Sequence, residues 1–180
     1  MENDVIELIL GGAKSGKTAH ALECAVNTGL PVTYVATATS GDEEMADRIA
    51  NHKAERPDHW GLIEEPVRLA QIVDIHAVLG QCIIIDCLTL WFTNLLFNDD
   101  GDLFARQTEA FLLAMENSKG HIIMVSNETG LGIVPVNKMS RQFCDAAGLM
   151  HQRLASISTR VRMVIAGLPL ELKKNTENCA

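Results

Sequence analysis

The chain has 180 residues, of which 47% are hydrophobic and 21% charged, a composition typical of a globular protein with one substantial core rather than of a disordered chain. The formal net charge of −8 disfavours nucleic acid as a partner. The five cysteines include no C-x-x-C pair, which disfavours a disulfide framework or a structural zinc site. No apolar stretch is long enough for a signal peptide or a membrane span, and unpaired thiols suit a reducing compartment, so we expect a cytoplasmic protein. The length predicts a single domain over residues 1–180.

Strands and helices are expected to alternate along the chain. The strands are short and nearly unbroken apolar runs, which are typical of a parallel sheet covered on both faces. In chain order we expect a strand from Val5 to Leu10, a helix from Lys17 to Asn27, a strand from Val32 to Ala36, a helix from Asp42 to Arg56, strands from Cys82 to Ile85 and from Ile122 to Val125, a helix from Val136 to Ile157 and a strand from Val161 to Ala166. This alternation predicts a doubly wound α/β fold, a mostly parallel sheet flanked by helices.

A glycine-rich segment joins the first strand to the first helix. It matches the pattern G-x-x-x-x-G-K-[ST] and consists of Gly11, Gly12, Ala13, Lys14, Ser15, Gly16, Lys17 and Thr18. In such a phosphate loop the backbone N–H groups surround an anion, the lysine reaches the β- and γ-phosphates, and the threonine hydroxyl binds Mg²⁺. Because a strand precedes the segment and a helix follows it, we predict a nucleoside triphosphate site with Lys17 as a catalytic group, in preference to a structural glycine-rich turn.

Asp86 directly follows the apolar strand from Cys82 to Ile85. The carboxyl ends of parallel strands share one edge of a sheet, so this carboxylate is expected beside the phosphate loop. There it would bind or neighbour Mg²⁺ together with Thr18. The alternative is a solvated carboxylate in a loop.

The segment from Asp42 to Arg56 places a histidine among cationic side chains. On a helix, Arg48, His52 and Arg56 lie four residues apart and share one face, and Lys53 is next in sequence. Neighbouring positive charge keeps an imidazole neutral and nucleophilic at pH 7, and the same cations suit phosphate groups. His52 is therefore a candidate nucleophile, although an ordinary histidine on a charged surface helix has the same spacing.

Five stretches of the chain, in this order, resemble one known family. They are GGAKSGKT, DEEMADRIANHKAERPDHW, IIIDCLTLWFTNLL, VSNETGLGIVPVNKMSRQFCDAAG and VIAGLPLELK, and the likeness extends from Leu8 to about Lys173. The family is the bifunctional adenosylcobinamide kinase/adenosylcobinamide-phosphate guanylyltransferase of cobalamin biosynthesis. The resemblance implies a RecA-like P-loop fold and two reactions. ATP or GTP phosphorylates the aminopropanol hydroxyl of adenosylcobinamide, and GTP then gives GMP to a histidine, from which adenosylcobinamide phosphate takes it to form adenosylcobinamide-GDP.

The resemblance also implies roles for individual residues. By matching position, His52 would carry GMP. The guanine-nucleotide site would be lined by Thr37, Ala38 and Thr39, by Lys53, Ala54, Glu55 and Arg56, and by Glu64 and Asp86. The family further implies a homo-oligomer, reported as a trimer, with sites near the subunit boundaries. Cys144 and His151 depart from the Arg and Asn that are usual at these positions.

Three alternative functions make different demands on the sequence. A monofunctional small-molecule kinase would need Lys17, Thr18 and Asp86 but no nucleophilic histidine. A GTP-dependent switch would recognise guanine with the carboxylate of an N-K-x-D pattern, and here the stretch Asn137-Lys138-Met139-Ser140 ends in serine instead. A nucleic-acid motor is disfavoured by the net charge and by the lack of an aromatic-basic run.

Overall fold

The computed structural model describes residues 5–38 and 57–174. Within them lie β1 (Ile6–Gly11), α1 (Lys17–Asn27), β2 (Val32–Ala36), β3 (Gly61–Glu64), α3 (Leu69–His76), β4 (Cys82–Asp86), α4 (Leu88–Leu96), α5 (Leu103–Asn117), β5 (His121–Asn127), α6 (Lys138–Ile157), β6 (Arg160–Ile165) and β7 (Leu168–Lys174). The helix expected from Asp42 to Arg56 lies outside the described residues. Of the helices that are described, none is both long and apolar enough to cross a membrane.

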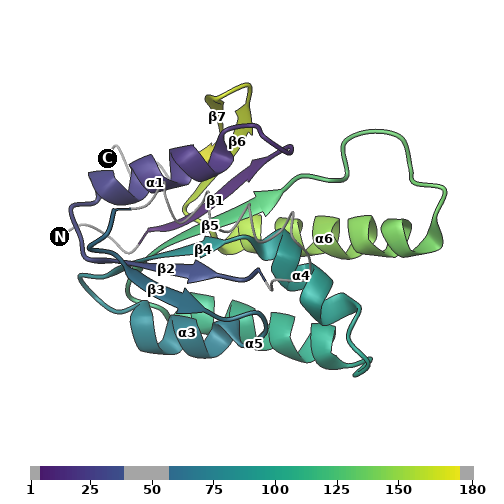
Figure 1. Ribbon diagram of the computed structural model, residues 1–180, viewed down its shortest axis with the longest axis horizontal. Helices are drawn as coiled ribbons and strands as arrows, with labels where there is room; N and C mark the ends of the chain where they lie inside the picture. The colour runs from purple at the N-terminus through teal and green to yellow at the C-terminus, as the bar shows by residue number, and fades with distance from the viewer. Residues whose placement is uncertain (1–4, 39–56, 175–180) are drawn as a thin grey trace, which may run out of the picture.

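The strands form one seven-stranded sheet in the order β3-β2-β4-β5-β1-β6-β7. All neighbouring strands are parallel except β6 and β7, which form an antiparallel hairpin at one edge. Helix α1 covers one face of the sheet, and α3, α4, α5 and α6 cover the other (Figure 1). The predicted α/β architecture, a mostly parallel sheet flanked by helices, is confirmed.

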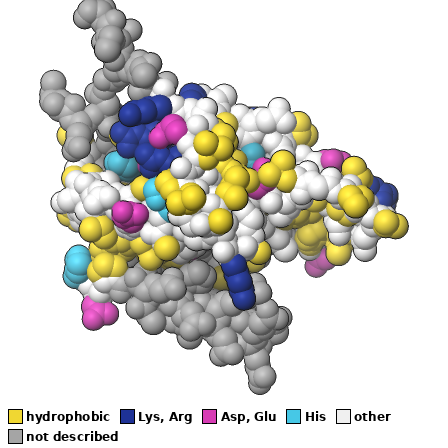
Figure 2. Space-filling view, turned by 90° about the horizontal axis from the view of Figure 1, so that it is seen from above, with side chains coloured by type: hydrophobic (Ala, Val, Ile, Leu, Met, Phe, Trp, Pro, Cys, Tyr) yellow, Lys and Arg dark blue, Asp and Glu magenta, His cyan; other side chains and the backbone are white. Residues whose placement is uncertain are grey.

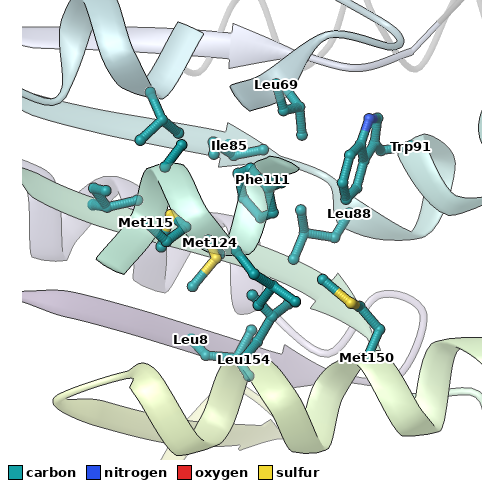
Figure 3. Packing of buried hydrophobic residues seen from close by; sticks show 14 of the residues in the cluster. Leu8, Leu69, Ile85, Leu88, Trp91, Phe111, Met115, Met124, Met150 and Leu154 are labelled. Atoms are coloured by element: carbon teal, nitrogen blue, oxygen red, sulfur yellow. The ribbon is translucent and has the colours of Figure 1, made fainter. Parts of the chain in front are cut away.

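Burial on both faces explains why the central strands are continuous apolar runs. Because side chains alternate across a strand, Ile122 and Met124 of β5 point into the core under α3–α6, whereas Ile123 and Val125 point toward α1. The larger of the two clusters contains Trp91 and the other side chains labelled in Figure 3. The sheet is thereby fixed between two apolar layers.

The structure corrects several sequence expectations. Strands β3 and β7 were not predicted, because they lie at the two edges of the sheet, are largely exposed, and so lack an unbroken apolar run. Helix α6 begins at Lys138 rather than Val136, since the Asn137 side chain accepts the backbone N–H of Met139 at 2.8 Å and caps the helix. Strand β6 ends before Ala166, whose positive φ of 52° belongs to the turn into β7.

Trp91 is the largest fully buried side chain of the core, so its removal is expected to destabilise the protein. Trp91 is fully buried, its ring centroid lies 4.9 Å from that of Phe111, and its Nε1–H donates to the Val67 carbonyl at 2.8 Å. We expect Trp91→Ala to lower the free energy of unfolding by about 3–5 kcal/mol, because it leaves a cavity and an unpaired carbonyl. Urea denaturation measures this change. The half-buried Trp60 provides the matched control, and an equal loss in Trp60→Ala would contradict the assignment of Trp91 as the core residue.

Candidate functional site

The phosphate loop, residues 11–18, turns from the end of β1 into the start of α1. Its backbone enters the left-handed region at Lys14 (φ 54°) and at Gly16 (φ 94°), and Ser15 N–H donates to the Gly12 carbonyl at 3.3 Å. Gly16 is the N-cap of α1 and has no side chain to occupy the N–H groups of the first turn. These N–H groups and the positive end of the helix dipole are therefore available to an anion.

Lys17 is held against this loop. It is 8% exposed, and its Nζ donates a hydrogen bond to the Gly12 carbonyl oxygen at 3.1 Å. Burial lowers the pKa of Lys17, whereas Cys87 and Asp86 at the end of β4 act in the opposite direction. The charge of Asp86 therefore acts on the ammonium group of Lys17.

The carboxyl ends of five neighbouring strands lie on the same side of the sheet as the loop. We call this side, where the strands end, the phosphate-loop edge. Gly11 of β1 is paired with Asn127 of β5, Asp86 of β4 with Ala36 of β2, and Ala36 with Glu64 of β3. Asp86 and Glu64 therefore lie on the predicted edge. Glu64 is the more remote of the two, because β2, β4 and β5 separate its strand from β1.

Asp86 is held in place by Tyr34 of β2 and by Thr37, the residue that follows β2. The Tyr34 hydroxyl donates to Asp86 Oδ2 at 2.6 Å. The Thr37 hydroxyl donates to the Cys87 carbonyl at 2.7 Å and accepts the Cys87 N–H at 3.0 Å. Since Thr37 is fully buried, its side chain joins the ends of β2 and β4 and so helps to position Asp86.

Two of the predicted residues suit a divalent cation. Thr18, in the first turn of α1, offers a hydroxyl oxygen, and Asp86 offers a carboxylate. Mg²⁺ prefers such hard oxygen ligands and commonly takes only one or two of them from the protein. The donor set at this edge therefore fits the predicted ion.

Six of the predicted site residues lie outside the described part of the chain: Thr39, His52, Lys53, Ala54, Glu55 and Arg56. The roles proposed for them stay predictions. Ala38, which is half-buried, directly follows Thr37 at the phosphate-loop edge of the sheet.

Sequence reasoning gave no role to a second polar cluster at this edge. The backbone N–H of Glu128, just beyond β5, donates to the Gly11 carbonyl at 3.0 Å. Ser126 Oγ lies 2.8 Å from His151 Nε2, and Thr89 Oγ1 accepts the Asn127 N–H at 2.7 Å. The sequence contains the same signal for Glu128 as for Asp86, namely an acidic residue that closely follows an apolar strand.

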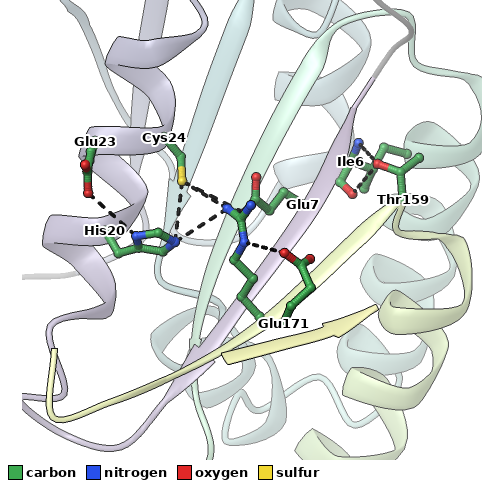
Figure 4. Close-up of polar contacts among 8 residues, drawn as sticks. Ile6, Glu7, His20, Glu23, Cys24, Thr159 and Glu171 are labelled. Carbon is green, nitrogen blue, oxygen red and sulfur yellow. Dashed lines mark hydrogen bonds and ion pairs between the residues drawn. The ribbon is translucent and has the colours of Figure 1, made fainter. Parts of the chain in front are cut away.

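A cavity of about 1040 Å³ lies elsewhere, between α1 and the β6–β7 hairpin. In its wall the Arg162 guanidinium donates to the carboxylate of Glu7, which is 1% exposed, and to Cys24 Sγ at 3.3 Å (Figure 4). Burial raises the pKa of Glu7, and Arg162 acts against this rise. On the face viewed in Figure 2, a cluster of basic side chains lies against an acidic side chain. Of the described residues predicted for the nucleotide site, only Gly16 lines this cavity.

Gly11 gives a prediction on the rigidity of the loop. A Cβ at this position would lie 2.7 Å from the Val164 carbonyl oxygen and 2.5 Å from Ser15 Oγ, whereas one at Gly12 would meet no atom within 4 Å. We expect Gly11→Ala to lower the free energy of unfolding by about 1–3 kcal/mol, because β1 and β6 must separate to admit the methyl group. Thermal unfolding of both variants tests this, and a Gly12→Ala variant as unstable as Gly11→Ala would show that the packing is not responsible.

Comparison with known proteins places this geometry in a family. A family model described as cobinamide kinase / cobinamide phosphate guanyltransferase matches residues 7–172. The chain is 50% identical over 167 residues to the bifunctional adenosylcobalamin biosynthesis protein CobP of Pseudomonas aeruginosa, which covers 93% of this chain and 96% of that one. It is 34% identical over 179 residues to CobU of Salmonella typhimurium, with 92% and 98% covered.

Among solved structures, a protein from Pyrococcus horikoshii OT3 superposes with a TM-score of 0.52 at 10% identity, covering 98% of this chain and 90% of that one. At this identity the likeness concerns the fold alone. The sequence relatives, in contrast, match almost the whole chain and confirm the resemblance seen in the motifs. The chain therefore belongs to the cobinamide kinase / cobinamide phosphate guanyltransferase family.

Proposed function

We propose that this protein phosphorylates the aminopropanol hydroxyl of adenosylcobinamide with ATP or GTP, and then transfers GMP from GTP to the product, giving adenosylcobinamide-GDP for the nucleotide loop of cobalamin. The observation that carries the proposal is the phosphate loop, with Lys17 held against it and Asp86 beside it, in a chain of this family. A nucleoside triphosphate is the substrate that both reactions share.

In the first reaction the hydroxyl oxygen of the acceptor attacks the γ-phosphorus, and the bond to the β-phosphate oxygen breaks. The nucleoside diphosphate leaves with the electron pair. The N–H groups of residues 11–18 hold the phosphates, and the Lys17 ammonium balances the charge that moves onto the oxygen of the leaving group. Mg²⁺, when bound through Thr18 and Asp86, would neutralise phosphate charge.

In the second reaction we assign the nucleophile to His52. An imidazole nitrogen attacks the α-phosphorus of GTP and pyrophosphate leaves, so that GMP is joined to His52. A phosphate oxygen of adenosylcobinamide phosphate then attacks the same phosphorus and frees the histidine. Contacts to the nucleotide are proposed for Thr37, Ala38, Thr39, Lys53, Ala54, Glu55, Arg56, Glu64 and Asp86.

The proposal extends to the state of the protein in the cell. We place it in the cytoplasm as a homo-oligomer, a trimer, which acts on small molecules and not on nucleic acid. The net charge of −8 supports the last point, because a phosphate backbone is repelled by an acidic surface. Size-exclusion chromatography with light scattering tests the trimer.

The function itself is tested with two labels. Purified protein is incubated with Mg²⁺ and α-labelled GTP without corrinoid, and separately with γ-labelled ATP and adenosylcobinamide. We expect acid-labile, base-stable label on the protein in the first experiment and labelled adenosylcobinamide phosphate in the second. Product without protein-bound label would identify a monofunctional kinase, and nucleotide binding with neither reaction would reject the proposal.

A further inference from the structure

The segment that joins β5 to α6 begins with a carboxylate beside the phosphate loop. Glu128 is attached to the loop through its N–H, which donates to the Gly11 carbonyl at 3.0 Å. Its Oε1 accepts the Gly130 N–H at 2.6 Å, and its side chain is 20% exposed. The carboxylate is therefore ordered and partly accessible to solvent, on a residue whose backbone contacts the phosphate loop.

A buried histidine lies next to this carboxylate. His151 of α6 is 7% exposed in its side chain, and its Nε2 lies 2.8 Å from Ser126 Oγ. Its Nδ1 is buried without a hydrogen bond and lies 3.7 Å from Glu128 Oε2, so a small movement would complete that bond. Burial lowers the pKa of His151, and the nearby Glu128 carboxylate opposes this change without reversing it. The imidazole thus has a fixed partner on one side and faces the carboxylate on the other.

The rest of the segment exposes aliphatic side chains. Residues 129–136 carry no charge, and Ile133 and Val136 are 98% and 96% exposed, with Leu131 and Val134 above 70%. The segment extends away from the body of the protein (Figure 1). Its two ends are nevertheless tied to α6, because Cys144 Sγ lies 3.5 Å from the Thr129 carbonyl and Arg141 Nη1 donates to the Pro135 carbonyl at 3.0 Å.

We propose that residues 128–136 form the acceptor site of the kinase reaction, in which Glu128 takes the proton of the acceptor hydroxyl and the exposed aliphatic side chains contact the apolar surface of the corrinoid. This inference rests on the proposed kinase function. His151 is a positioning residue that acts through Glu128.

The acceptor O–H bond breaks as the oxygen forms its bond to the γ-phosphorus, and the proton passes to a Glu128 carboxylate oxygen. The bond between the γ-phosphorus and the β-phosphate oxygen breaks, and its electron pair leaves with the nucleoside diphosphate. The reaction requires no further reactant. A positioned carboxylate is suited to this role because it accepts the proton only while the new bond forms.

The position of the phosphoryl donor indicates which ligand contacts the segment. An acceptor must bring its hydroxyl to the γ-phosphate, so its remaining bulk has to lie at the phosphate-loop edge, where Glu128 and the segment also lie. The uncharged surface at 129–136 suits a large ligand with apolar faces better than a strongly charged one. A second copy of this chain is the alternative occupant, and the experiments below distinguish the two.

The carboxylate is tested by Glu128→Gln, which keeps the shape but cannot accept the proton. We expect the kinase kcat to fall by about 10²–10⁴-fold, with KM for the nucleotide and the covalent GMP label retained. Glu116→Gln, an exposed carboxylate on α5, is the matched control. A kcat within threefold of wild type would overturn the role of Glu128. If the wild-type protein itself made no phosphorylated corrinoid, the proposed function and not this inference would have failed.

The positioning role of His151 is tested with a polar and an apolar replacement. Asn keeps a donor and an acceptor, whereas Leu keeps only volume. We expect His151→Leu to lower kcat at least tenfold with KM for adenosylcobinamide nearly unchanged, and His151→Asn to restore most of the rate. Equal rates in both variants, at equal thermal stability, would overturn the role.

The corrinoid contact is tested by the double variant Ile133→Ser and Val136→Ser. We expect KM for adenosylcobinamide to rise at least tenfold, with nucleotide KM and oligomeric state unchanged. Leu79→Ser is the control, since Leu79 is 79% exposed and precedes β4 at the opposite edge of the sheet. A variant that dissociates into smaller oligomers would show that the segment is a subunit contact, and an unchanged KM would equally overturn the proposal.

Discussion

Replacement of Lys17 by alanine is expected to reduce kcat/KM of the kinase reaction by about 1,000-fold. The side chain is already held over the loop, with Nζ 3.1 Å from the Gly12 carbonyl, so its charge is in place before the nucleotide binds. A preorganised cation of this kind stabilises the charge that develops on the phosphates, and its removal commonly costs two to three orders of magnitude in rate. The rate is measured as transfer of label from γ-labelled ATP to adenosylcobinamide.

The fold is expected to survive this change. Burial lowers the pKa of Lys17 and outweighs the attraction of Cys87 and Asp86, so the charged side chain is not a net source of folding stability. Lys119→Ala provides the control, because Lys119 is exposed just before β5 at the opposite edge of the sheet. Kinase rates near those of wild type in Lys17→Ala, with thermal stability unchanged, would show that residues 11–18 do not hold the transferred phosphate.

The parts of the site that could be predicted from sequence are those that depend on neighbours in the chain. A phosphate loop is recognisable because the apolar run of β1, the glycines and the start of α1 are contiguous, and the structure has these elements in that order. Asp86 was located because a carboxylate at the end of a buried strand must lie at one edge of the sheet. Both inferences need only the local pattern and the rule for parallel strands.

Other features depend on contacts between distant residues, and no local pattern contains them. The bond from Tyr34 to Asp86 joins residues 52 positions apart, and Ser126 meets His151 at a separation of 25. Which side chains of β4 and β5 meet which helix is decided by how the sheet stacks its layers. The edge strands were not predicted for a related reason. Strand β7 is exposed, and its alternating leucines do not form the continuous apolar run of a buried strand.

Replacement of His52 by alanine is expected to abolish guanylyl transfer while the kinase reaction continues. The covalent step needs an imidazole nitrogen for which alanine offers no substitute, so protein-bound label from α-labelled GTP should disappear entirely. The kinase reaction uses the acceptor hydroxyl as nucleophile and does not pass through the histidine. We therefore expect phosphorylated adenosylcobinamide to accumulate in the variant, because the GMP transfer that consumes it has stopped.

The matched control is His59→Ala, since His59 is exposed and lies seven residues further along the chain. It should retain both the label and the transfer of GMP. Label that persists in His52→Ala would assign the nucleophile to another side chain. Simultaneous loss of both reactions, in a variant that still binds GTP and unfolds at the wild-type temperature, would show that the kinase also depends on His52. The two single variants thus test different steps. Lys17→Ala tests how the phosphates are bound, and His52→Ala tests the step in which GMP becomes covalently bound.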